Sequence, residues 1–156
     1  MAPRQAPQDE LLAEFLEHVA SGLGLNATVR VTMDDDEVCG VLEGDDLGIF
    51  IGRHGATIEA VQHLAQRMLL ADPDAPRRRI VVDAAGYRAR RREALQKQAD
   101  QAAADALRGE RPVALDAMTA SERKIVHEHL RDRDDIETYS EGDEPERHLV
   151  VAPRSA

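Results

Sequence analysis

Apolar residues recur at two different periods along the first half of the chain, and these periods predict helices and strands. Residues 9–23 have an apolar residue every three or four positions, which predicts an amphipathic helix with Leu12, Phe15, Leu16, Val19 and Leu23 on its buried side. Residues 26–33 alternate between apolar and polar, which predicts a half-buried strand with Ala27, Val29, Val31 and Met33 on one side and polar residues on the other. The acidic turn Asp34-Asp35-Asp36 leads into a second strand over 37–43, so we expect a hairpin.

The helical period returns around a pair of glycines. Residues 44–51 predict a short helix, and Gly52-Arg53-His54-Gly55 interrupts it. A longer helix is expected over 56–70, with Ile58, Val61, Leu64, Ala65 and Met68 turned inward. After a Pro- and Asp-rich break, residues 79–83 predict a strand.

The second half has a different order of elements, so the chain holds two unlike units and no internal repeat. A long helix is expected over 86–107, followed by a short extended segment at 112–115. Thr119 and Glu122 form a capping box that starts a helix over 119–131, and strands follow at 136–140 and 148–151. The pattern predicts an α+β fold of two small domains joined by a long helix.

Gly52 and Gly55 bracket a turn that can approach a ligand closely, because neither residue carries a Cβ atom. Free N–H groups and the positive end of the next helix dipole face such a ligand, which favours an anion. Arg53 adds charge, His54 adds a donor, and Ile51 and Ile58 flank the turn. The alternative is a tight corner between two helices that binds nothing.

Arg123 and His127 lie four residues apart, so they share one face of the predicted helix over 119–131. A guanidinium beside an imidazole can grip a phosphate, whereas Ile125, Val126 and Leu130 are expected to pack the helix down. The alternative is an incidental surface pair, or Arg123 bonded to a nearby carboxylate such as Glu122.

The net charge of −10 argues against a general affinity for polyanions, but the charge is unevenly distributed. Residues 77–97 contain eight Arg and Lys against two Asp and Glu, which leaves a basic block in an acidic chain. The single cysteine, Cys39, makes no internal disulfide, and no cysteine cluster or His-Glu-x-x-His helix predicts a metal site. With no catalytic triad, cofactor motif or membrane-spanning run, we expect a cytoplasmic protein that is not an enzyme.

The segment "LGIFIGRHGATIEAVQHLAQRM" resembles the core of KH domains, in which Ile-Gly-x-x-Gly-x-x-Ile stands between two helices. The order helix–strand–strand–helix–helix–strand resembles the type II arrangement, and the resemblance places a KH domain at residues 8–84. It implies that the GxxG turn holds the backbone of single-stranded RNA, with single-stranded DNA as an alternative.

The segments "MTASERKIVHEHL" and "IETYSEGDEPERHLVV" resemble the Arg-x-x-x-His domain, which we place with its leading helix at residues 85–153. The two domains in this order resemble the Jag (SpoIIIJ-associated) family of bacterial RNA-binding proteins. The resemblance implies an RNA chaperone or post-transcriptional regulator that affects cell elongation or envelope homeostasis, with a smaller KH-only protein as a candidate partner. The candidate RNA contacts are Ile51, Gly52, Arg53, His54, Gly55, Ile58, Arg88, Arg123, His127 and Arg147. The alternative function is a protein-interaction adaptor whose KH groove is vestigial.

Overall fold

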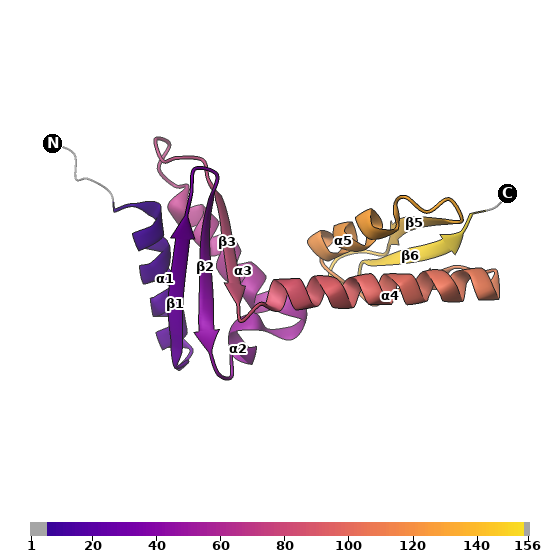
Figure 1. Ribbon diagram of the computed structural model, residues 1–156, viewed down its shortest axis with the longest axis horizontal. Coiled ribbons are helices and arrows are strands. Elements are labelled where there is room, and N and C mark those ends of the chain that lie inside the picture. Colours follow the sequence, from indigo (N-terminus) through magenta and orange to yellow (C-terminus); the bar gives the residue numbers. More distant parts are fainter. Residues whose placement is uncertain (1–5, 155–156) are drawn as a thin grey trace. The chain divides into compact units, whose positions relative to one another are not determined.

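The computed structural model describes residues 6–154 and divides the chain into two compact units, one ending at Arg88 and one beginning at Ala89 (Figure 1). Each unit combines helices with a three-stranded sheet, so the predicted α+β class is confirmed. Among the described residues, no helix is both long enough and apolar enough to cross a membrane.

The first unit has the predicted order of elements. They are α1 (Gln8–Gly22), β1 (Ala27–Met33), β2 (Glu37–Gly44), α2 (Gly48–Ile51), the 3-10 turn η1 (Arg53–Gly55), α3 (Ala56–Leu69) and β3 (Arg79–Ala84). Strand β2 lies between its neighbours, antiparallel to β1 and parallel to β3. The predicted hairpin is therefore confirmed, and its register pairs Met33 with Val38.

Helices α1 and α3 pack against the sheet (Figure 1). Their apolar sides meet the inward residues of β2 and β3. The side chains of Leu12, Leu16, Phe50 and Ile58 are completely buried in this core. Gly40 of β2 lets α1 approach the sheet, since a Cβ atom there would lie 2.4 Å from Cδ1 of Leu16.

Two details of the sequence prediction for this unit are wrong. The helix expected over residues 44–51 is only α2, because β2 continues to Gly44 and a turn follows it. Leu64 and Met68 were expected inward but are 57% and 42% exposed, since Val61, Ala65 and Leu69 form the buried stripe of α3. Met33 is 41% exposed at the end of the edge strand β1.

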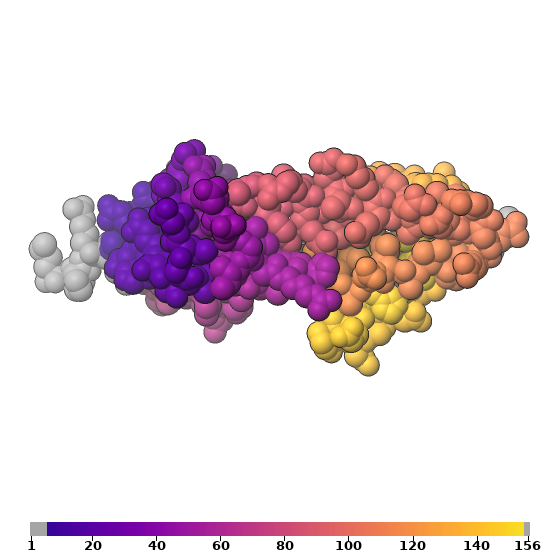
Figure 2. All heavy atoms as spheres, turned by 90° about the horizontal axis from the view of Figure 1, so that it is seen from below, coloured from indigo at the N-terminus to yellow at the C-terminus, as the bar shows by residue number. Residues whose placement is uncertain are grey.

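The second unit is built along α4 (Tyr87–Gly109), whose side chains form a continuous band in Figure 2. It continues with β4 (Val113–Ala114), α5 (Ala120–Leu130), β5 (Ile136–Glu141) and β6 (His148–Pro153), and its antiparallel sheet has the order β4-β6-β5. The core joins the alanines of α4 to Val126 and Leu130 of α5. These two residues of α5 were expected to pack the helix down, as was Ile125, which is partly buried against the same core. The capping box is confirmed, because Thr119 Oγ1 accepts from Glu122 N and Thr119 N donates to Glu122 Oε2.

Candidate nucleic-acid interface

The turn between α2 and α3 has an unusual backbone, and its two glycines make that backbone possible. Three of its four residues have positive φ angles, which are 74° at Gly52, 53° at His54 and 79° at Gly55. Residues with a Cβ atom rarely adopt such angles, so His54 is held there by its neighbours.

Neighbouring side chains also exclude a Cβ atom from both glycines. At Gly52, a Cβ atom would lie 2.3 Å from Oγ1 and 2.7 Å from the backbone nitrogen of Thr57. At Gly55, which is buried, it would lie 2.8 Å from the hydroxyl oxygen of Tyr87. The ring of Tyr87, the first residue of α4, therefore packs against the turn at Gly55. No sequence motif indicated this contact.

The outer surface of the turn carries positive charge and unused backbone donors. The side chains of Arg53 and His54 are exposed and form no ion pair or hydrogen bond with any described residue. Gly55 N donates to Gly52 O, and Ala56 N donates to Arg53 O. In contrast, the N–H groups of Arg53 and His54 have no acceptor among residues 6–154. The turn therefore offers two backbone donors beside two side-chain donors.

The isoleucines around the turn differ in their exposure. Ile51 is half-buried and packs against the core, and Ile58 is completely buried. Ile49 of α2, which the sequence analysis did not single out, is 57% exposed. The signal for Ile49 was present, since Leu47, Phe50 and Ile51 share the inward face and leave Ile49 pointing outward. A base beside the turn can therefore contact Ile49 and Ile51, whereas Ile58 has no exposed surface to offer.

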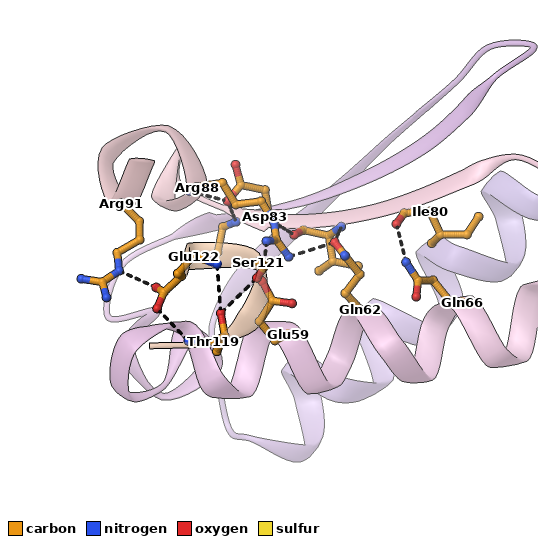
Figure 3. A network of polar contacts seen from close by, with 12 residues as sticks. Glu59, Gln62, Gln66, Ile80, Asp83, Arg88, Arg91, Thr119, Ser121 and Glu122 are labelled. Atoms are coloured by element: carbon orange, nitrogen blue, oxygen red, sulfur yellow. Dashed lines mark hydrogen bonds and ion pairs between the residues drawn. The ribbon is translucent and has the colours of Figure 1, made fainter. Parts of the chain in front are cut away.

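Arg88 is bound within the first unit by a network of hydrogen bonds (Figure 3). Its guanidinium donates to Glu59 Oε1 at 2.9 Å, to Gln62 Oε1 at 2.8 Å and to the carbonyl oxygen of Val82 at 2.7 Å. These contacts join α3 to the end of β3 and occupy the guanidinium. The RNA contact predicted for Arg88 stays a prediction, and these bonds leave the side chain 30% exposed.

Arg91, which lies in the same basic block, has a comparable contact within the second unit. Its Nε donates at 2.7 Å to Oε1 of Glu122, a largely buried carboxylate that also closes the capping box of α5 (Figure 3). Part of the basic block at residues 77–97 therefore binds carboxylates and carbonyl groups of the protein.

The structure brings Arg123 and His127 together in a shallow pocket between α5 and the strands β5 and β6, with a volume of about 440 Å³. Nδ1 of His127 lies 2.6 Å from Oγ1 of Thr138. The side chain of Arg123 is only 11% exposed, and its guanidinium donates to Met118 O and to Glu144 Oε1, both at 2.7 Å. The carboxylate partner of Arg123 is thus Glu144 and not the neighbouring Glu122.

Arg147 also lines this pocket, as does Lys124, which the sequence analysis missed. Nη1 of Arg147 donates to the carbonyl oxygen of Gly142 at 2.6 Å, so the side chain closes the turn that connects β5 to β6. Lys124 lies three residues before His127, so the two share one exposed face of α5, which was the available signal. Among residues 6–154, no three His, Cys, Asp or Glu side chains are placed to hold a metal ion.

Comparison with known proteins finds two matching domain families. Residues 13–82 match the KH domain of KhpA/KhpB, and residues 93–153 match the Arg-x-x-x-His domain. The glycine turn lies in the first match, and Arg123, His127 and Arg147 lie in the second. Tyr87 and Arg88, which contact the turn and α3, fall between the two matches.

Several bacterial relatives align with nearly the whole chain. The RNA-binding protein KhpB of Clostridium symbiosum is 32% identical over 153 residues, which are 97% of this chain and 68% of that protein. The RNA-binding proteins KhpB of Lactiplantibacillus plantarum and Bacillus subtilis are 33% and 31% identical, with 99% and 88% of this chain covered. This chain spans 48% and 67% of the length of those two relatives.

Proposed function

This chain belongs to the KhpB family, with a KH domain followed by an Arg-x-x-x-His domain, and we propose that it binds single-stranded RNA without catalysing a reaction on it. The observation that carries the proposal is the glycine turn at residues 52–55. It combines two backbone N–H groups that have no acceptor among residues 6–154 with the exposed side chains of Arg53 and His54.

The chemistry of this turn fits a sugar–phosphate backbone. A phosphate oxygen can accept from the N–H groups of Arg53 and His54 while the guanidinium of Arg53 supplies charge. None of the four residues is acidic, so no carboxylate repels the phosphate from within the turn. Ile49 and Ile51 offer apolar surface to a base. The pocket that contains His127 and Arg147 offers a second contact surface for RNA.

In the cell, we infer that the chain acts in the cytoplasm as an RNA chaperone or post-transcriptional regulator, with effects on cell elongation or envelope homeostasis. The resemblance to the Jag family supports this role. The proposed surface contacts mainly the RNA backbone and has few groups that read bases, so it is also suited to binding transcripts of many different sequences.

We also propose that a smaller KH-only protein binds the exposed face of α3. Leu64 and Met68 lie one turn apart on this face and are 57% and 42% exposed, which favours a protein partner over water. The variant Leu64→Gln with Met68→Gln should weaken a complex with a KH-only relative at least about tenfold in light scattering. The control His63→Gln with Arg67→Gln changes polar residues of the same helix and should leave the complex intact.

The RNA proposal is tested by reversing the charge of the turn. Arg53→Asp with His54→Asp should keep the fold, as seen in circular dichroism, and weaken binding of unstructured RNA by at least about tenfold in fluorescence anisotropy. The control His18→Asp with Arg30→Asp makes the same change on α1 and β1 and should bind normally. Normal affinity in the first variant would exclude the turn as the binding site, whereas wild-type protein that binds no RNA would favour the adaptor function.

A further inference from the structure

Arg123 and His127, the signature pair of the Arg-x-x-x-His domain, share a pocket with other side chains that could bind a phosphate of RNA. The pocket between α5 and the strands is of a size that holds a nucleotide, at about 440 Å³. Four cationic or titratable donors line it, which are Arg123, Lys124, His127 and Arg147. The four side chains differ in their exposure and in the partners that they already have, and these differences indicate which of them can bind a phosphate.

Arg123 is the least available of the four. Its guanidinium is held at both ends, by the carbonyl oxygen of Met118 and by the carboxylate of Glu144, and its side chain is only 11% exposed. The charge of Glu144 offsets the charge of Arg123 at a distance of 2.7 Å. A phosphate would therefore have to displace a charged partner from a nearly buried side chain.

The other three donors have room for a ligand. Lys124 is 74% exposed, and its ion pair with Glu128, at 3.8 Å, is too long for a hydrogen bond. Arg147 uses one nitrogen on the carbonyl oxygen of Gly142 and has no carboxylate partner among the described residues. Thr138 Oγ1 occupies Nδ1 of His127, which leaves Nε2 without a partner in the described part of the chain.

The contacts of Glu144 explain what Arg123 does instead. Glu144 stands between Gly142 and Arg147 in the turn that joins β5 to β6, and Arg123 ties the middle of this turn to α5. The backbone of Arg147 lies at the end of that turn, where its carbonyl oxygen accepts from Met118 N at 3.1 Å. The bond between Arg123 and Glu144 thus fixes the segment that carries Arg147.

We propose that Lys124, His127 and Arg147 bind a phosphodiester of single-stranded RNA, and that Arg123 is a positioning residue that holds the 142–147 turn through Glu144. This inference rests on the proposed function and deepens it. The two residues of the signature pair then have different roles, because His127 contacts the RNA and Arg123 acts through Glu144.

The inference is tested by removing Glu144. If Arg123 bound phosphate, Glu144→Ala would free the guanidinium and strengthen RNA binding. If Arg123 is a positioning residue, Glu144→Ala loosens the turn and weakens binding about three- to tenfold relative to Asp143→Ala. Asp143 is the matched control, because it removes the same charge from the same turn and its side chain has no partner among the described residues. Glu144→Gln keeps an oxygen acceptor for Arg123 and should restore the affinity of the Asp143→Ala control.

Anisotropy titrations of the full chain with a short unstructured RNA, at several salt concentrations, provide the readout. Lys124→Gln and Arg147→Gln should each reduce the slope of log affinity against log salt by about 0.7, as the loss of one phosphate contact on a single strand does. Glu144→Gln should leave the slope unchanged. Tighter binding by Glu144→Ala than by Asp143→Ala, or unchanged slopes for both cation variants, would overturn the inference while leaving RNA binding itself in place. Wild-type protein that binds no RNA would instead refute the proposed function.

Discussion

The substitution Gly55→Ala probes the shape of the glycine turn, on which the proposed RNA binding depends. Alanine at this position must adopt a φ of 79°, which costs about 1–2 kcal/mol. Its Cβ atom would also lie 2.8 Å and 2.9 Å from two ring-end atoms of Tyr87, and such overpacking costs about 1–3 kcal/mol. We therefore expect the free energy of unfolding to fall by about 2–5 kcal/mol.

The two contributions can be separated by a double-mutant cycle in urea, followed by circular dichroism. Tyr87→Ala removes the ring, so Gly55→Ala should then cost only its backbone part. The double variant should be less destabilised than the sum of the single variants by about 1–3 kcal/mol. The control Gly48→Ala lies in α2, where a Cβ atom meets nothing within 4 Å, and should be neutral or stabilising by up to about 1 kcal/mol.

Additivity of Gly55→Ala and Tyr87→Ala to within about 0.5 kcal/mol would refute the contact between the ring and the turn. The same outcome would remove the reason for treating Tyr87 as a support of the RNA-binding turn.

Three further predictions concern stability, each measured by urea unfolding. His54→Gly should leave the free energy of unfolding unchanged or raise it by up to about 1 kcal/mol, because glycine adopts a φ of 53° without strain; a clear loss would mean that the side chain is needed for packing. Thr119→Ala should lower it by about 1 kcal/mol and Thr119→Ser should not, since serine keeps the capping oxygen; equal values for the two would contradict the capping role. The Asp34 carboxylate accepts hydrogen bonds from the backbone N–H groups of Asp36 and Glu37, which lower its pKa below the ordinary value of 3.8. The ionised carboxylate therefore stabilises the fold above pH 3.8, and this stabilisation is lost as the pH falls through the lowered pKa. The advantage of the wild-type chain over Asp34→Ala should shrink in that acidic range, and an advantage independent of pH would exclude the carboxylate as its source.

Local patterns predicted most of the fold. The three- and four-residue period located α1, α3 and α5, and the capping box of Thr119 and Glu122 placed the start of α5 correctly. Each of these signals acts between residues close in sequence, where geometry is nearly fixed by the element itself. The same period failed at Leu64 and Met68, because an apolar residue is buried only when a neighbouring element covers it.

The candidate site was less predictable because long-range contacts decide which donors are available. Arg88, Arg123 and Arg53 are alike in the sequence, yet only Arg53 has a guanidinium without a partner among the described residues. Pairing of Arg123 with Glu144 joins residues that are 21 positions apart, and Tyr87 lies 32 positions after Gly55. No spacing rule connects such residues before the chain is folded.

The most direct measurement is a titration of the ¹⁵N-labelled full chain with a short unstructured RNA, followed by NMR. The backbone amide signals of Arg53 and His54 should shift with a common saturation curve, and high salt should reverse the shifts. Saturable binding that leaves both amide signals in place would show that RNA meets the protein elsewhere, and the glycine turn would then not be the binding site.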